Sequence, residues 1–329
     1  MKTKEFAKPF KTIDEQVEIL KSRNLNIKFE DKAKKLLRLY GYYKIMNGYQ
    51  KPFWASEDWF LPNTEFAHIL FLYDFDTSLR NCLLELFLVL ERSVKTIVSY
   101  EFCKEFGELG YLNKENYSEF ADEQQLDELL KKMRQIKASA STKPKHEDSH
   151  FQNSFKFRPV QHYVEKYGDV PLWVMMESMT LGNLSVMYSL LKPNTKRHIA
   201  EAMSELSGTY FTYTDITISL KIITLCRNAC AHDCTIYNFT MQNNISKKNS
   251  FLNDVKKYYP DLKTNNIAGG IIILASLLPQ DRLKSDLLAL KQYFESMQTV
   301  FSPQAYKNVK DYFGFDLPLL IDTLIRVMK

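Results

Sequence analysis

The sequence predicts an all-α protein, and three observations carry this prediction. Apolar residues recur at intervals of three and four in many segments, which is the spacing that one face of a helix requires. Gly and Pro are sparse, at 10 and 11 of 329 residues, whereas a β-sandwich usually has many of both in its turns. The alternation typical of strands is rare. The length is ample for a large core, in one domain or two.

Composition and charge predict a folded chain in a reducing compartment. The net charge of +5 favours polyanionic partners only mildly. The five cysteines are odd in number and three of them fall within nine residues, which is not a secreted disulfide framework. The N-terminus lacks a signal peptide, and the apolar run Ile267–Leu278 is shorter than the ~20 residues that cross a bilayer. We therefore expect a cytoplasmic protein with no membrane contact.

The first predicted helices follow from capping and periodicity. Thr12 and Glu15 form a capping-box pattern at the start of a short helix, and a second helix is predicted over Asp31–Tyr40. The longest helix is predicted over Thr64–Phe106, and a helix of this length needs partners along most of its course, as the spine of a bundle has. Its regularly spaced apolar residues are Leu72, Leu79, Leu83, Phe87, Leu90, Val94 and Ile97.

Residues 40–53 are dense in aromatics and carry lysines. Tyr42, Tyr43 and Lys44 are candidate RNA-binding residues, because aromatic rings stack on bases and cations hold phosphates. The alternative is a Tyr-rich lid that packs over the first helices, since aromatic side chains bury large areas wherever they lie.

The middle of the chain predicts a helix over Asp122–Lys137 and then a mobile polar loop near residues 138–157. His146 and His150 lie in this loop, but no thiol or second histidine pair accompanies them, so we expect no zinc site there. Further helices are predicted over residues 171–192, 199–206, 212–232, 250–258, 266–278, 280–299, 303–313 and 317–328, with a loop over 238–250. The expected organisation is an N-terminal aromatic–basic segment (1–60), a helical bundle (61–240) and a C-terminal helical region packed on the bundle (241–329).

The end of the helix predicted over 212–232 carries the main candidate site. Arg227 falls on the apolar stripe of this helix, and an unpaired charge buried there costs several kcal/mol, roughly. Such a residue needs a partner, an anion or a chemical task. The apolar members of the stripe are Ile216, Leu220, Ile223 and Cys230.

His232 lies five residues after Arg227, and its ordinary pKa of about 6.5 suits acid–base chemistry. An arginine for a phosphate and a histidine for a proton are what RNA cleavage by the ribose 2′-OH requires, with Asn228 holding the phosphate or Arg227. On an ideal helix Arg227 and His232 point roughly 140° apart. The arginine can curl, the helix can unwind near Ala231, or a two-fold dimer can bring two copies of the motif together.

Three other interpretations of these residues stay open. Arg227 can reach solvent while His232 only ends the helix, where the helix dipole favours it. Glu91, on the long helix, can be the ion-pair partner of Arg227 in a purely structural role, or be a solvated helix edge. Cys226, Cys230 and Cys234 are spaced along a helix axis rather than around an ion, so small apolar packing is favoured over metal binding.

Motifs in four regions occur in a distinctive order. Lys8-Pro9-Phe10 precedes residues 14–20; Leu39-Tyr40-Gly41-Tyr42-Tyr43-Lys44 precedes Gly48-Tyr49; Tyr73-Asp74-Phe75-Asp76 and Leu79-Arg80 lead to Leu90-Glu91; and Pro171-Leu172-Trp173, Glu177 and Leu181-Gly182-Asn183-Leu184 lead to Arg227-Asn228 and His232. In this combination, which covers most of residues 8–235, the chain resembles the Abi-like family of bacterial abortive-infection proteins, of the AbiD/AbiF type.

That family is placed in the HEPN superfamily, whose helical bundles carry an Arg-x(4–6)-His motif in metal-independent and often dimeric ribonucleases. The resemblance implies an HEPN-like bundle, Arg227 and His232 as the catalytic pair, Asn228 as a supporting residue, and no metal or other cofactor. It implies a homodimer that cleaves RNA in phage defence, leaving 2′,3′-cyclic phosphate and 5′-OH ends. The alternative is a non-catalytic protein that holds a structured RNA or a regulatory partner.

Overall fold

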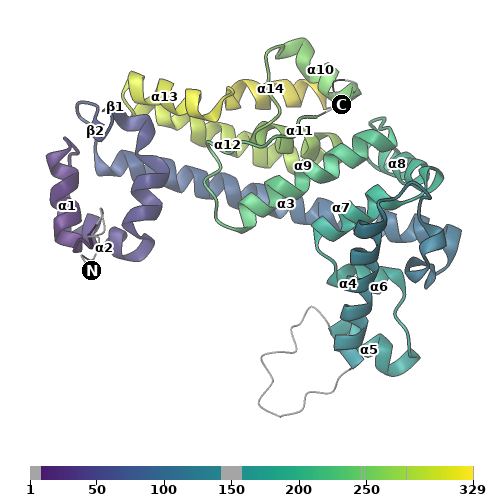
Figure 1. Cartoon of the computed structure of the whole chain (residues 1–329). Coiled ribbons are helices and arrows are strands. Elements are labelled where there is room, and N and C mark those ends of the chain that lie inside the picture. The colour runs from purple at the N-terminus through teal and green to yellow at the C-terminus, as the bar shows by residue number, and fades with distance from the viewer. Residues whose placement is uncertain (1–8, 142–157, 246, 248, 279, 329) are drawn as a thin grey trace. The chain divides into compact units, whose positions relative to one another are not determined.

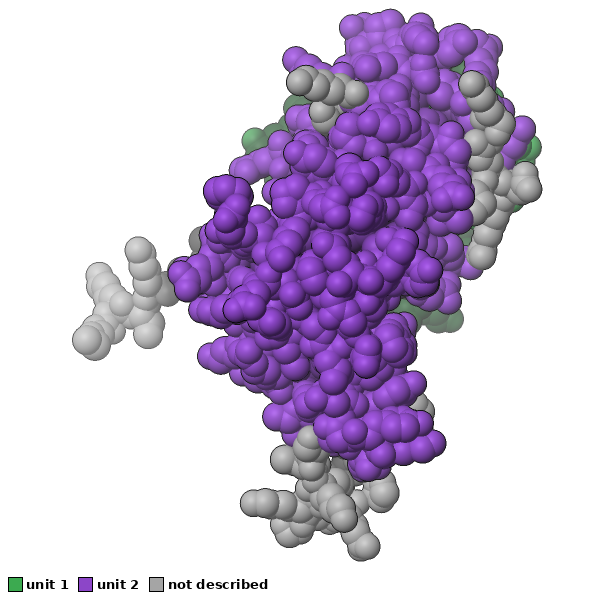
Figure 2. Space-filling view, turned by 90° about the vertical axis from the view of Figure 1, so that its right-hand side faces the viewer, with its two compact units in different colours: residues 1–82, 233–239, 285–322 green, residues 83–232, 240–284, 323–329 purple. Residues whose placement is uncertain are grey.

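A computed structural model describes residues 9–141, 158–245, 247, 249–278 and 280–328 (Figure 1). Its regular structure is helical apart from one two-stranded sheet, so the predicted all-α class is confirmed. The chain divides into two compact units (Figure 2). Unit 1 comprises Met1–Cys82, Asp233–Phe239 and Ser285–Asp322, and unit 2 comprises Leu83–His232, Thr240–Lys284 and Thr323–Lys329. Each unit thus combines separate stretches of sequence, whereas the segments expected from the sequence are consecutive.

The helices and strands of the two units are as follows. Unit 1 contains α1 (Ile13–Ser22), α2 (Glu30–Tyr40), the π-helix η1 (Tyr43–Asn47), the 3₁₀ helix η2 (Lys51–Phe53), the antiparallel strands β1 (Trp54–Ser56) and β2 (Trp59–Phe60), and α13 (Pro303–Phe313). Unit 2 contains the 3₁₀ helices η3 (Gly110–Leu112) and η4 (Lys114–Asn116), α4 (Glu123–Ser141), α5 (Arg158–Tyr167), α6 (Leu172–Ser178), α7 (Leu181–Leu190), α8 (Pro193–Ser207), α9 (Tyr213–Ala231), α10 (Ser250–Tyr258) and α11 (Ile267–Leu277). Three helices contribute residues to both units: α3 (Phe66–Phe106), α12 (Gln280–Val300) and α14 (Leu317–Val327).

Local signals account for most helix ends. The capping box at Thr12 and Glu15 is present, and a second one at Thr212 begins α9. The helix predicted over 171–192 is instead two helices, because Thr180 caps α7 and interrupts the chain after α6. Residues 138–141, predicted to lie in a loop, extend α4; the rest of that loop, with His146 and His150, lies outside the described residues.

The core of unit 2 is organised around α9, which packs against α7, α8 and α11. Gly270 allows the close approach of α11, because a Cβ there would lie 2.9 Å from the Cys226 sulfur and 3.1 Å from the Phe87 ring. Burial raises the pKa of the Cys226 thiol, as expected of a packing residue. Since α9 ends at Ala231, Cys234 does not continue the helical row of cysteines. No helix in the described ranges is long and apolar enough to cross a membrane.

Unit 1 is organised around the Asp76 carboxylate of α3, whose side chain is wholly buried. It accepts hydrogen bonds from the Tyr49 hydroxyl (2.8 Å) and from the backbone N–H groups of Ile236 (3.0 Å) and Tyr237 (2.7 Å). The Arg80 guanidinium donates to it at 3.3 Å. Three stretches of chain therefore meet at one carboxylate. It accepts hydrogen bonds from buried donors that water does not reach.

A second carboxylate, that of Asp233, extends this network. Its oxygens lie 2.6 Å from the Arg80 guanidinium and 2.9 Å from the Lys44 ammonium, and Lys44 also donates to the Asp233 carbonyl. Arg80 donates in addition to the Cys234 carbonyl (3.1 Å). Asp233 has a φ of 55°, a left-handed conformation that costs a non-glycine residue free energy unless its surroundings hold it there. The two cations supply that restraint.

We expect Asp76→Asn to lower the free energy of unfolding by about 3 kcal/mol, because an amide group would face donors where the carboxylate accepted them. Urea unfolding measures the change. Asp74→Asn is the matched control, since Asp74 lies on the same helix with an exposed side chain. A loss for Asp76→Asn no larger than that of the control would contradict the central role of this carboxylate.

Candidate active site

Arg227, Asn228 and His232 all lie at the C-terminal end of α9 in unit 2. The helix ends at Ala231, and His232 is its C-cap residue, with its backbone N–H donating to the Asn228 carbonyl (2.9 Å). The φ and ψ of His232 are −96° and 19°, so its side chain no longer follows the ideal helical direction. The imidazole is exposed and makes no hydrogen bond within the parts of the chain that the structure describes.

Arg227 is held from two sides. Its Nε lies 3.4 Å from a carboxylate oxygen of Glu91 on α3, and neither atom has a hydrogen-bond partner among the described residues. Its Nη1 donates to the Asn228 side-chain oxygen at 3.3 Å. About a quarter of the arginine side chain (26%) stays exposed. The structure thus brings Arg227, Asn228 and Glu91 together.

Glu91 is shared between two cations. Its other carboxylate oxygen lies 2.9 Å from the ammonium of Lys95, one turn further along α3. The Glu91 and Lys95 side chains are only 8% and 11% exposed. One negative charge therefore faces two positive charges in a poorly hydrated place, and the excess positive charge favours a bound anion next to Arg227.

Lys95 is the site residue that sequence reasoning missed. The signal was present, because Glu91 and Lys95 stand four residues apart, the spacing at which opposite charges pair on a helix. Both also lie beside the buried residues Leu90 and Val94 of α3. Two opposite charges within an apolar stretch indicate a buried pair rather than a solvated edge.

The candidate RNA-binding residues Tyr42, Tyr43 and Lys44 belong to unit 1, at η1. Lys44 forms an ion pair with Asp233. Tyr42 is half-buried, and this burial raises the pKa of its hydroxyl. Tyr43 is 79% exposed, so its ring is the one of the three side chains that is fully open to a partner.

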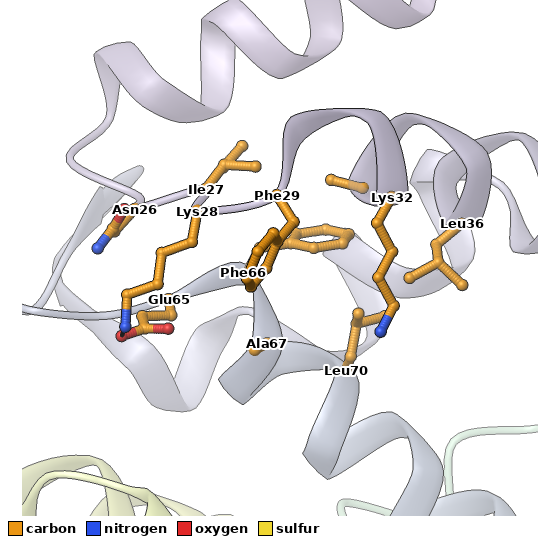
Figure 3. A pocket seen from close by; sticks show the side chains of 11 residues that line it. Asn26, Ile27, Lys28, Phe29, Lys32, Leu36, Glu65, Phe66, Ala67 and Leu70 are labelled. Carbon is orange, nitrogen blue, oxygen red and sulfur yellow. Dashed lines mark ion pairs between the residues drawn. The ribbon is translucent and has the colours of Figure 1, made fainter.

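Unit 1 also has a hollow of about 200 Å³ between α2 and the start of α3 (Figure 3). The Lys28–Glu65 ion pair (2.5 Å) stands at one end of the hollow and Lys32 at the other. Apolar side chains line the space between them, and one of these, Phe29, is 74% exposed. The described residues that line it include no histidine, serine or cysteine, and its one carboxylate, that of Glu65, is paired with Lys28.

A double-mutant cycle separates the two ion pairs of Glu91. We expect a coupling free energy of about 1–3 kcal/mol between Glu91→Gln and Lys95→Met, because that pair is short and nearly buried. The coupling between Glu91→Gln and Arg227→Met should stay below about 1 kcal/mol, because the contact is longer and its atoms make no hydrogen bond. Chemical denaturation of the four proteins in each cycle gives both values. A larger coupling for Arg227 than for Lys95 would assign Arg227 a structural role.

Comparison with known proteins identifies a family. Residues 35–238 match the model of the Abi-like protein family, a range that includes α9 with Arg227, Asn228 and His232 as well as the Asp76 network. No curated protein and no solved structure matches the chain significantly. The matched range covers more than half of the chain. The chain therefore belongs to the Abi-like protein family.

Proposed function

We propose that this protein is a metal-independent endoribonuclease of phage defence, with Arg227, Asn228 and His232 as its active site. Membership of the Abi-like family suggests a role in abortive infection. The observation that carries the proposal is the shared Glu91 carboxylate, which leaves the charge of Arg227 only partly compensated. An exposed histidine ends the same helix.

In the proposed reaction the neutral His232 imidazole takes the proton of a ribose 2′-OH. The 2′ oxygen then attacks the adjacent phosphorus, and Arg227 stabilises the negative charge that develops on the phosphoryl oxygens. Asn228 keeps the guanidinium oriented through its hydrogen bond to Nη1. The bond from phosphorus to the 5′ oxygen breaks, leaving a 2′,3′-cyclic phosphate. DNA lacks the nucleophile, so the substrate class is RNA.

The departing 5′ oxygen must receive a proton, and a second histidine is the natural donor. A two-fold homodimer supplies one, because each copy brings its own His232 to a shared cleft. Exposed leucines on the two helices that carry the site offer apolar surface to a second copy. Leu225 on α9 is 39% exposed and lies two residues before Arg227, and Leu88 on α3 is 40% exposed and lies three residues before Glu91. A second copy would cover both.

The second candidate function is RNA binding without cleavage. The observation that favours it is the 79% exposed ring of Tyr43, which could stack on a base without any catalytic group nearby in the sequence. In that case Arg227 binds a phosphate and His232 has no proton to transfer. The two functions differ in what His232→Ala does.

The decisive experiment incubates the purified protein with total cellular RNA in EDTA. We expect wild type to cut RNA and leave 2′,3′-cyclic phosphate ends, and we expect His232→Ala to lower the rate by at least ~10² while RNA affinity stays within about twofold. His162→Ala is the control, because His162 on α5 is another exposed histidine of unit 2. Cutting by His232→Ala at the wild-type rate would remove His232 from the active site. RNA retention without cutting by either protein would replace the enzyme by the binding function.

The homodimer has its own test in analytical ultracentrifugation. We expect wild type to sediment at twice the mass of the chain and Leu225→Glu to sediment as a monomer, because a charge at the centre of an apolar contact is desolvated without a partner. Leu206→Glu on α8 is the control, since Leu206 is an exposed helical leucine (53%) of the same unit. If both variants sediment as dimers, the interface does not include Leu225. If the wild-type protein sediments as a monomer, the proposed mechanism loses its second histidine.

A further inference from the structure

Unit 2 has a hollow of about 560 Å³ between the C-terminal half of α3 and the start of α6. Its volume lies within the range of small-ligand sites. Tyr100 and Trp173 line it, together with Lys104 and Glu108. The activity proposed above uses none of these residues.

The local fold explains how Glu108 comes to lie beside the hollow. Gly107 ends α3 with a φ of 77°, a left-handed turn that glycine adopts freely. The carbonyl of Glu108 then accepts a hydrogen bond from the N–H of Leu172 (3.0 Å), which ties the start of α6 to the end of α3. Burial and the nearby Glu108 carboxylate raise the pKa of the Cys103 thiol to about 11. Glu108 itself is one of the residues that line the hollow.

Two aromatic rings face solvent at this hollow. Tyr100 is 65% exposed and Trp173 is 49% exposed, although both residue types usually bury most of their surface. Open aromatic faces that line one hollow are a platform on which a planar ring can stack, and the nucleobase of an RNA strand is such a ring. Trp173 belongs to a sequence motif of this chain for which the proposed reaction has no use.

The Glu108 carboxylate determines which base can form hydrogen bonds while it stacks on these rings. An ionised carboxylate only accepts hydrogen bonds, through two adjacent oxygens. The Watson–Crick edge of guanine presents two adjacent donors, N1–H and the 2-amino group, which match this pair of acceptors. Adenine and cytosine each place a ring-nitrogen acceptor beside their amino group, and uracil places its one donor between two carbonyls. On each of these bases an acceptor atom would face a carboxylate oxygen, and two acceptors repel each other.

The Lys104 cation at the hollow suits the phosphate of a nucleotide. The Lys104 side chain is 68% exposed and its contact with Glu101 is long, at 3.8 Å, so its ammonium can reach a phosphate. Glu91, the ion-pair partner of Arg227, lies on α3, the helix that also carries Lys104. Thr96, at the near end of the hollow, stands five residues beyond Glu91, or about 7.5 Å along the helix axis.

We propose that this hollow binds an unpaired guanine, with Trp173 and Tyr100 stacking on the base and Glu108 accepting hydrogen bonds from its Watson–Crick edge. The inference deepens the proposed function and rests on it for its biological sense, because a guanine held here selects the RNA strands that reach Arg227. A guanine base can also come from a free nucleotide, and the two sources share the same recognition chemistry.

Isothermal titration calorimetry tests the site with GMP, AMP and UMP, and with 2′-O-methyl oligonucleotides that do or do not contain one guanine. The 2′-O-methyl group removes the nucleophile, so binding is measured whether or not the protein cuts RNA. We expect GMP to bind at least about tenfold more tightly than AMP or UMP. Trp173→Ala should weaken GMP at least about tenfold, and Glu108→Gln should abolish the preference for guanine. Trp59→Ala is the matched control, because Trp59 is also 49% exposed but lies in unit 1.

The outcomes separate the two sources and the two proposals. Tighter binding of the guanine-containing oligonucleotide than of GMP assigns the hollow to an RNA strand, and the reverse order assigns it to a free nucleotide; both support the guanine site. Equal binding of all bases, or an unchanged preference in Glu108→Gln, overturns it. RNA cleavage by wild type together with no guanine binding overturns this inference alone. Guanine binding without cleavage leaves it standing and removes the ribonuclease.

Discussion

The buried carboxylate of Asp76 is the constraint on which unit 1 depends. It joins Tyr49, Arg80 and the segment that begins 160 residues later at Ile236. A carboxylate without exposed surface is stable only if every lone pair finds a donor, and here hydroxyl, guanidinium and backbone donors are all present. Such a group fixes one arrangement of the chain, because other pairings of these segments would leave the charge without partners.

The same network determines how the chain continues after α9. Helices commonly end with a glycine in the left-handed conformation, and here Asp233 takes that conformation one residue after His232. Lys44 and Arg80 bind its carboxylate and offset the cost of the backbone geometry. The Tyr-Lys and Asp-x-x-x-Arg motifs of the N-terminal third thus have a structural role. Lys44, a candidate for RNA from the sequence alone, makes an ion pair with a residue 189 positions away.

The sequence predicted those parts of the fold that depend on neighbouring residues. Capping pairs and apolar spacing indicated the start of α1 and the extent of α3 and α9, because a helix satisfies its hydrogen bonds within a few residues. It did not predict the break before Thr180, where an asparagine takes the place of the usual Glu or Gln in the capping box. The spacing of four residues between Asp76 and Arg80, which Asp74 lacks, is a local signal for a helical ion pair. The other partners of Asp76 could not be predicted, because Tyr49, Ile236 and Tyr237 lie far away in the sequence.

The candidate site also contains features that the sequence predicted and one that it did not. Helical periodicity placed Arg227 on a buried stripe and so indicated that it needs a partner, but it did not reveal that Lys95 shares Glu91. That sharing matters for the proposed chemistry. A guanidinium fully neutralised by its own carboxylate would gain little from a developing phosphoryl charge, whereas one that shares its counter-ion gains more as the charge grows. Contacts to a guanine at Glu108 are equal in ground and transition states, so they raise affinity without raising the rate of the bound complex. In the proposed enzyme, rate therefore arises at Arg227 and the choice of RNA arises at Trp173 and Glu108, within one unit.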